Sequence, residues 1–412
     1  MRLGLLAAFL VGLALSITLA QAALAALAVR LLWRLATGRA RPGGWPLAGT
    51  FAAWVAASLL AVLLSSRPLE SLSAARGLLL IATFYVVLDA LADRREAAGV
   101  LGSLLALGGG LGLVGSLQVL LCPALPTAAP LLGRLARNCE RAHAFYSIYM
   151  TLAGVLSLVL LATLPSLLQA GPGRRWRWLA WLLGGLGLAL TYVRGAWLGF
   201  LAGAVVLLGL VRRGRLLVAA GVLVLIAAIV LTPGLRRRAE SIADRTDSTA
   251  RERLAMWRSG LAMVRDHPLT GIGPGQVKHR YPGYAAPEFA HKRRGHLHNT
   301  PLQVAVERGL LGLGAWLALF ATFFWRSARL LGRLGPEDRQ ARAVVVGSIA
   351  AVAGFLVGGL TEYNFGDSEV VMVAYTVMAL PFVVAGRPGA PPRTPPVTTA
   401  PHRSRASGTP PA

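Results

Sequence analysis

The residues best suited to chemistry are one histidine and two arginines that lie far apart in the sequence. His298 stands in GHLHNTPLQVAVERGLLG (residues 295–312), just before Asn299 and Pro301, a capping side chain and a proline typical of a helix start. The positive end of a helix dipole disfavours imidazolium, so His298 should stay neutral and able to accept a proton. This suits a general base near pH 7. The alternative is a histidine that only assists the cap or contacts lipid headgroups.

The first arginine, Arg194, lies in TYVRGAWLGF between two apolar segments that leave almost no room for a loop. A guanidinium so close to hydrocarbon costs free energy unless it is paired or reaches the headgroups. Arg194 is therefore a candidate functional residue, and snorkelling to the interface is the alternative.

The second arginine, Arg253, lies in the longest polar stretch of the chain. From about Thr249 to Val264, apolar residues recur at helical spacing, which predicts an amphipathic helix lying in the membrane interface. The apolar residues are Leu254, Trp257, Leu261 and Val264, and the charged ones among them are Arg251, Glu252, Arg253 and Arg258. The GIGPGQV that follows (residues 271–277) predicts a turn and not a phosphate loop, since neither a preceding strand nor a following helix is evident.

Further polar candidates lie in TEYNFGDSE (residues 361–369), where Glu362, Tyr363, Asn364 and Asp367 could orient a sugar or the histidine. An ordinary polar connection between spans is the alternative. No metal site or other cofactor is predicted, because the loop histidines lack acidic partners and ligand spacing. These are His267, His279, His291, His296 and His298.

These residues are set in a strongly apolar chain of 412 residues, 55% hydrophobic and 14% charged. Apolar runs of about 15 to 25 residues recur, a length that matches the bilayer core. The composition predicts an all-α, polytopic integral membrane protein with about 12 transmembrane helices and one large periplasmic loop that contains amphipathic helices. The predicted spans are 4–20, 22–36, 47–65, 75–92, 97–121, 143–163, 177–193, 196–211, 215–232, 303–325, 341–360 and 368–386.

The N-terminus imitates a secretory signal, but its apolar character continues to Trp33, which favours an uncleaved anchor. A single helix from Leu3 would be about 46 Å long, well over the ~30 Å core. The polar residues Ser16, Thr18 and Gln21 suggest a hairpin of two short spans instead.

Arginines in alternate loops predict the orientation by the positive-inside rule, with both termini in the cytoplasm. Four regions follow: a bundle of about nine spans (1–232), a periplasmic loop (233–301), three further spans (302–386) and a disordered cytoplasmic tail (387–412). The periplasmic loop holds 13 Lys and Arg against 6 Asp and Glu. This favours anionic partners such as phosphates, with membrane lipids as the alternative, and no nucleic acid is expected. Cys122 and Cys139 share another external loop and could form a disulfide.

The chain resembles the O-antigen ligases of the O-antigen ligase and polymerase superfamily. His298 and Asn299, then nine residues, then Gly309 and Gly312 match the ligase pattern H-N-x9-G-x-x-G. The R-x-x-x-L element of these ligases resembles Arg194 to Leu198. Their loop arginine ahead of a tryptophan resembles Arg253 and Trp257, with Arg251 as the competing choice, and DHPLTGIG (residues 266–273) is similar to their loop.

The resemblance implies a bacterial inner-membrane glycosyltransferase whose active site faces the periplasm. It would transfer O-antigen polysaccharide from undecaprenyl pyrophosphate to lipid A–core, with inversion and without metal. His298 would be the base, and Arg194 and Arg253 would stabilise the leaving diphosphate. Arg251, Arg258, His296, Asn299, Glu362 and Tyr363 complete the predicted site as substrate-binding residues.

Three alternatives stay open at this stage. The neighbouring polymerase branch would use the same donor to extend O-antigen or exopolysaccharide, and a protein O-oligosaccharyltransferase would use a protein acceptor. A transporter predicts charges buried in mid-span, whereas these spans are nearly free of charge, with Asp89 the main exception.

Overall fold

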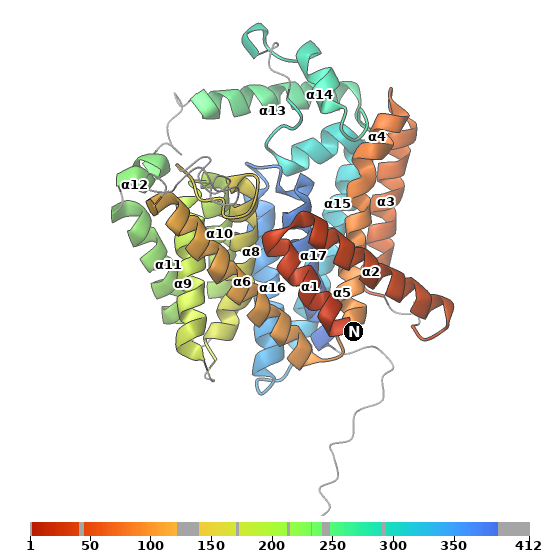
Figure 1. Cartoon of the computed structure of the whole chain (residues 1–412). Helices are drawn as coiled ribbons and strands as arrows, with labels where there is room; N and C mark the ends of the chain where they lie inside the picture. The colour runs from red at the N-terminus through yellow and green to blue at the C-terminus, as the bar shows by residue number, and fades with distance from the viewer. Residues whose placement is uncertain are drawn as a thin grey trace, which may run out of the picture.

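The structure is a computed structural model that describes residues 2–40, 45–121, 140–169, 173–211, 215–231, 233–240, 248–289 and 294–385. Within these residues, α and 3-10 helices are the only regular secondary structure, as the sequence predicts. The longer helices run side by side in one bundle, and α13 (Ser248–Asp266) and α14 (Val277–Arg280) lie across one end, called the loop face below (Figure 1). Cys122, Cys139 and the tail 387–412 lie outside the described residues.

A helix lies at each of the twelve predicted segments. In chain order they are α1 (Arg2–Leu15), α2 (Ile17–Ala36), α3 (Ala48–Leu63), the run α4 (Pro68–Ala74), η1 (Ala75–Leu80) and α5 (Ile81–Ala90), α6 (Arg94–Leu121), α8 (Tyr149–Leu167), α9 (Arg174–Leu190), α10 (Arg194–Leu210), α11 (Arg215–Leu231), α15 (Thr300–Arg333), α16 (Arg339–Gly358) and α17 (Ser368–Val384). A further short helix, α12 (Pro233–Glu240), follows α11.

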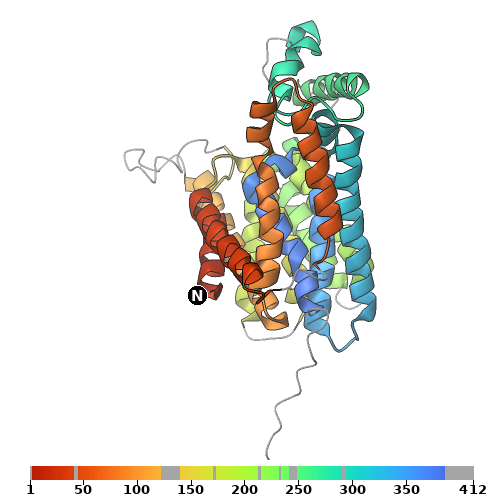
Figure 2. The same cartoon turned by 90° about the vertical axis from the view of Figure 1, so that its right-hand side faces the viewer.

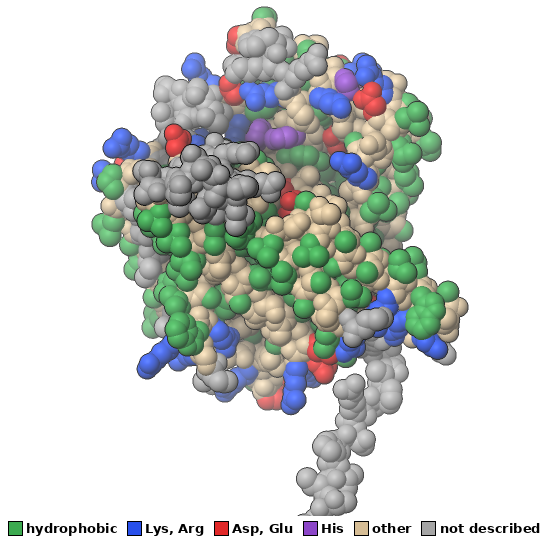
Figure 3. Space-filling view, in the orientation of Figure 1, with side chains coloured by type: hydrophobic (Ala, Val, Ile, Leu, Met, Phe, Trp, Pro, Cys, Tyr) green, Lys and Arg blue, Asp and Glu red, His purple; other side chains and the backbone are tan. Residues whose placement is uncertain are grey.

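Six helical segments of the described chain are long and apolar enough to cross a membrane: α2, Pro68–Ala90, α6, α8, α15 and α16. Helices α1, α3, α10 and α17 are apolar but shorter. In Figure 3, Lys and Arg gather at both ends of the molecule, and its middle is mostly hydrophobic or uncharged. These features support an integral membrane protein, and twelve crossings stay a prediction.

The N-terminal segment folds as two helices, not one. Ser16 adopts an extended conformation between α1 and α2 and caps α2 with its side chain, earlier than the predicted boundary near Gln21. The two helices touch so closely that a Cβ on Gly12 would lie 2.4 Å from the Ala20 nitrogen. At 1.5 Å per residue α1 is about 21 Å long, which is shorter than a bilayer core of about 30 Å. The α1–α2 pair stands on the flank of the bundle (Figure 2).

Ion pairs hold the open end of this hairpin against the bundle. Arg2 pairs with Glu96 at the start of α6, and Arg30 and Arg34 both pair with Asp89 at the end of α5. Asp89, the main charged exception in the predicted spans, is thus a buried carboxylate between two guanidinium groups. Pairing of this kind removes most of the cost of burying the charge.

The most buried helices of the bundle are α8, α16 and α17. Glycines let their neighbours approach: a Cβ on Gly199 of α10 would lie 2.5 Å from the Gly354 carbonyl oxygen of α16. Small residues at such contacts are typical of helix packing in membranes. The close contact brings the first turn of α10 to the segment that links α16 to α17.

Helix α15 is broken, which the predicted continuous span 303–325 did not anticipate. It begins where expected, with the Asn299 side chain accepting a hydrogen bond from the Leu302 N–H (2.9 Å), but Gly309 is non-helical at φ 65° and ψ −171°. Its first turns lie at the loop face, and the part after Gly309 descends along the bundle (Figure 1). The longer continuous stretch of helix therefore starts after Gly309.

The turn predicted from the glycine-rich sequence fills this break. Residues 268–273 supply the hydrogen bonds that the interrupted helix cannot make for itself. The bonds are Ile272 N to Val306 O (2.9 Å), Gly273 N to Glu307 O (3.0 Å), Leu310 N to Pro268 O (2.7 Å) and Leu311 N to Leu269 O (3.3 Å). Two of the stretches that carry the family resemblance, 266–273 and Gly309 to Gly312, thus form one structural unit.

Replacing Gly309 by alanine should destabilise the protein strongly. A Cβ there would lie 2.1 Å from the Leu269 carbonyl oxygen, and the residue has a positive φ. With its ψ of −171° this is a conformation that residues other than glycine essentially do not adopt, at a cost of roughly 1–3 kcal/mol, and the contact adds to it, so we expect a loss of at least about 2 kcal/mol. The thermal unfolding midpoint in detergent measures the effect. Gly314→Ala, in open space on the same helix, is the matched control, and equal midpoints for the two variants would contradict the expectation.

Candidate active site

The segment before α15 holds His298 in an unusual backbone conformation. His298 has φ 49°, in the left-handed region that non-glycine residues rarely adopt. The backbone on either side of it is held by hydrogen bonds: the Leu297 N–H donates to the Gln303 side chain (2.9 Å), and the Thr300 N–H donates to the Gly359 carbonyl (2.7 Å). His298 therefore lies immediately before the capped helix, as predicted.

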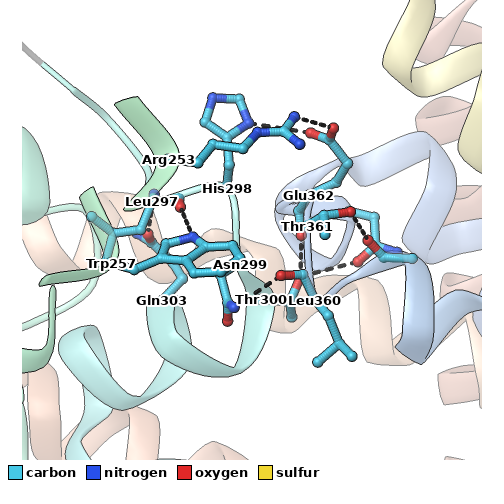
Figure 4. A network of polar contacts seen from close by, with 12 residues as sticks. Arg253, Trp257, Leu297, His298, Asn299, Thr300, Gln303, Leu360, Thr361 and Glu362 are labelled. Carbon is cyan, nitrogen blue, oxygen red and sulfur yellow. Dashed lines mark hydrogen bonds and ion pairs between the residues drawn. The ribbon is translucent and has the colours of Figure 1, made fainter. Parts of the chain in front are cut away.

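Glu362 joins the predicted base to one of the predicted arginines. Its Oε1 accepts a hydrogen bond from Arg253 Nη2 at 2.6 Å, and its Oε2 lies 3.2 Å from His298 Nδ1. Figure 4 shows both partners reaching this carboxylate. The three side chains come from α13, the segment before α15 and the α16–α17 connection, and they are only 11% to 18% exposed. The fold thus brings together residues more than 60 positions apart.

The surroundings keep Glu362 ionised. Burial raises the pKa of its carboxyl, but the hydrogen bond with His298 and the nearby Arg253 charge outweigh burial, so the pKa lies below its ordinary value. An ionised carboxylate only accepts hydrogen bonds, so Nδ1 of a neutral His298 carries the proton and Nε2 keeps its lone pair. The prediction relied on the helix dipole alone. In the structure a carboxylate also orients the ring and can stabilise the imidazolium formed on proton transfer.

Arg194 adjoins this group. It is the first residue of α10, and its side chain is buried, at 8% exposure, so it does not extend to solvent as a snorkelling side chain would. At the next residue, Gly195, an added Cβ would lie 2.2 Å from Thr361 Oγ1 and 3.2 Å from Glu362 Cγ. The start of α10 therefore packs directly against the segment that carries Glu362.

His296 forms a second, uncharged histidine beside His298. The two rings meet edge to face with centroids 4.3 Å apart, and the Tyr363 ring lies 5.8 Å from His296. Burial, and secondarily the neighbouring His298, lowers the pKa of His296 to about 4. Its Nδ1 is a buried atom with no hydrogen-bond partner among the described residues. His296 is thus a neutral group at the site.

Acid should destabilise the protein through His296. Its pKa is about 4 in the folded chain and near 6.5 when unfolded, so between these values only the unfolded chain binds the proton. This contribution to stability is complete above pH 6.5 and is lost as the pH falls towards 4, at up to about 1.4 kcal/mol per pH unit. The unfolding midpoint in detergent should fall over this window. His296→Phe should remove most of that fall and the control His279→Phe should not; an unchanged slope in His296→Phe would refute the assignment.

A cavity of about 280 Å³ opens beside these residues. Its polar lining includes His296, Glu362 and Tyr363, and its apolar lining includes Phe355 of α16 and Val370 of α17. Figure 3 shows histidine side chains in a hollow between the loop region and the bundle. The cavity therefore offers both polar groups and apolar surface to a ligand.

Two predicted substrate-binding residues do not join the group. Helix α13 buries Met256 and Met263 in a small core with Leu297 and Val306, whereas Arg251 and Arg258 are exposed. Residues 251 and 258 share the opposite side of the helix with the exposed Leu254, Leu261 and Arg265. The helix itself is where the periodicity predicted it. Of the apolar residues predicted for its membrane face, however, Trp257 and Val264 pack on that core and only Leu254 and Leu261 are exposed.

The other predicted residues have structural contacts. Asn299 caps α15 and donates through Nδ2 to the Leu360 carbonyl (2.9 Å). Burial raises the pKa of Tyr363, whose ring lines the cavity. The sequence reasoning missed Gln303 and Glu307, both almost completely buried beneath His298. The available signal was two polar residues four positions apart in the first turns of an apolar helix.

The comparisons with known proteins agree with the resemblance drawn from the motifs. Residues 178–317 match the family model described as O-Antigen ligase. The exopolysaccharide production protein ExoQ of Rhizobium meliloti (strain 1021) is 31% identical over 132 residues, an alignment that covers 29% of this chain and 29% of that protein. The matched region contains Arg194, Arg253 and His298 and ends before Glu362. Over this region the chain is therefore similar to the O-antigen ligase family, and it spans less than a third of the length of this relative.

Proposed function

We propose that this protein is an inverting, metal-independent glycosyltransferase of the O-antigen ligase and polymerase superfamily, which moves O-antigen polysaccharide from undecaprenyl pyrophosphate to lipid A–core. The observation that carries the proposal is the contact of Glu362, which lines the cavity, with both His298 and Arg253. A histidine oriented by a carboxylate, next to guanidinium groups, is suited to deprotonating a hydroxyl beside a phosphate leaving group.

His298 is the base in this mechanism. Its Nε2 takes the proton of an acceptor hydroxyl while the hydroxyl oxygen attacks the anomeric carbon of the donor sugar. The bond from that carbon to the diphosphate oxygen breaks, and its electron pair leaves with undecaprenyl pyrophosphate. A single displacement inverts the anomeric centre. Glu362 holds the ring and balances the charge of the imidazolium.

Arg194 and Arg253 bind and stabilise the leaving diphosphate. Guanidinium groups form bidentate, charge-assisted hydrogen bonds with phosphate oxygens, a role that a divalent cation fills in other enzymes. Arg253 is held by Glu362, and Arg194 is buried next to the segment that bears Glu362. The apolar lining of the cavity supports the lipid part of the donor, and the loop face would then face the periplasm with both termini in the cytoplasm.

A polymerase of the same superfamily is the second candidate function. The relative ExoQ is named as an exopolysaccharide production protein, and this favours the polymerase branch. The two activities share donor chemistry and differ in the acceptor, which is lipid A–core for a ligase and a second lipid-linked glycan for a polymerase.

Purified protein in proteoliposomes tests the proposal. It is given lipid-linked O-antigen with either rough lipopolysaccharide or further lipid-linked repeat units, each with and without a chelator. Glycan joined to rough lipopolysaccharide in the presence of chelator supports the ligase. A ladder of longer lipid-linked glycans supports the polymerase. Loss of transfer on chelation would contradict the metal-independent mechanism.

A further inference from the structure

A buried chain of hydrogen bonds runs from the glycine-rich turn to the backbone beside His298. Glu307 Oε1 accepts from the Gly275 N–H and from Gln303 Nε2, both at 2.9 Å. The other end of the same amide, Gln303 Oε1, accepts from the Leu297 N–H at 2.9 Å. The two side chains therefore connect residue 275 to residue 297 through the first turns of α15. We call this pair the Gln303–Glu307 bridge.

Both residues of the Gln303–Glu307 bridge are buried, so their polar groups need hydrogen-bond partners inside the protein. Gln303 is 0% exposed and Glu307 only 4% exposed. A carboxylate in such a place is costly unless several donors satisfy it. Glu307 has three, since Arg308 Nη1 also donates to its Oε2 at 2.7 Å. Arg308 in turn donates to Ser58 of α3 at 3.1 Å. Because the helix breaks at Gly309, its first stretch ends at Arg308, the residue after Glu307.

The backbone at Leu297 and His298 needs contacts from outside this segment to keep its conformation. His298 has a positive φ, and a non-glycine residue keeps such a conformation only when its surroundings impose it. Side chains bind both backbone groups of Leu297. Its N–H donates to Gln303, and its carbonyl accepts a hydrogen bond from the indole N–H of Trp257 (3.1 Å). The Trp257 contact comes from α13, so the two restraints approach the segment from different elements.

We infer that Gln303 and Glu307 are positioning residues, which hold His298 in its strained backbone conformation so that its ring meets Glu362. The catalytic consequence rests on the function proposed above, whereas the restraint on the backbone does not. Because the amide both donates to Glu307 and accepts from Leu297, no apolar residue of the same size can replace Gln303. Its orientation is set by Glu307, whose carboxylate can only accept.

Exchanging the amide and the carboxylate between positions 303 and 307 tests the inference. Gln303→Glu keeps the shape of the side chain but places a second carboxylate against Glu307, in a buried site. We expect the hydrogen-bonded chain to break and kcat to fall by about 10- to 100-fold, with KM for the donor changed by less than about threefold, as misplacement of a catalytic group predicts. In the double variant Gln303→Glu/Glu307→Gln, the amide of residue 307 can donate to the carboxylate of residue 303, which still accepts from the Leu297 N–H. The Gly275 N–H loses its acceptor, so we expect a partial recovery of kcat.

A measurement that needs no activity accompanies the kinetics. Amide hydrogen exchange of peptides covering residues 294–299 should speed up in Gln303→Glu and return towards the original rate in the double variant. Peptides from α8 and α16 should not change in either. Gln169→Glu is the matched control, because that glutamine bonds the Arg339 carbonyl at the opposite end of the bundle.

Unchanged exchange at residues 294–299 in Gln303→Glu, or no recovery in the double variant, would overturn the inference. Faster exchange that the double variant reverses would support it. Should these exchange changes occur while even the original protein transfers no glycan, the bridge stands and the proposed function fails.

Discussion

Replacing His298 by alanine should abolish glycan transfer while the protein still folds and inserts. The variant loses the only group assigned to take the acceptor proton, and general-base catalysis is worth about 10² to 10⁴ in rate. Glu362 keeps its hydrogen bond from Arg253 when the imidazole is removed, so we expect the variant to remain folded. Transfer by purified protein in proteoliposomes, normalised to folded protein by gel filtration, measures the loss.

His279→Ala is the matched control for this variant. His279 is a histidine of the same polar region, bonded to Glu70 at 2.8 Å and away from the Glu362 group. The His279→Ala variant should transfer glycan at the rate of the original protein. His298→Gln separates two roles, since an amide can hydrogen-bond an acceptor sugar but cannot take its proton. Full transfer by His298→Ala would remove the base assignment, and substantial transfer by His298→Gln alone would reduce the histidine to positioning the acceptor.

Replacing Glu362 by glutamine should reduce kcat by about 10² to 10³. The neutral amide no longer balances the Arg253 guanidinium, and its NH₂ group can face Nδ1 of His298. A ring that accepts at Nδ1 carries its proton on Nε2, where it cannot act as a base. The loss should be in kcat, since the shape of the side chain is kept, and steady-state kinetics at saturating donor measure it.

Glu70→Gln is the control for this second variant, since Glu70 also pairs with a histidine and an arginine, His279 and Arg67. Glu70 is exposed and lies outside the cavity, so its replacement should leave kcat within about twofold, as for most surface substitutions. An active Glu362→Gln variant would show that Arg253 and His298 act without the shared carboxylate, and the mechanism would lose its orienting group.

The helical plan of this protein was readable from its sequence. Apolar runs of bilayer length predicted twelve segments, and a helix lies at each of them, because length and hydropathy are local properties of the chain. The cap at Asn299, the helix of α13 and the turn at 271–275 were predicted for the same reason. The resemblance of the motifs to the O-antigen ligases singled out His298, Arg194 and Arg253, and the family match covers all three.

The sequence patterns did not predict the relations between distant segments. They placed Arg251 and Arg258 with Arg253, but a helix turns by about 100° per residue, and only packing decided that Arg253 reaches Glu362 while the other two are exposed. They allowed Glu362 as one of several polar loop residues. Its contact with His298 across 64 positions depends on the hydrogen bonds of Asn299 and Thr300 to residues 359–362.

The break of α15 at Gly309 is also a feature that contacts between distant segments decide. A glycine within an apolar run is compatible with a continuous helix, and the run was predicted as one span. The helix breaks because residues 268–273 supply the backbone partners that a broken helix lacks, and a local pattern does not contain those partners. Sequence alone determined which residues form helices and which of them could do chemistry. Tertiary structure decided which side chains meet, because that depends on contacts between segments that the chain brings together only on folding.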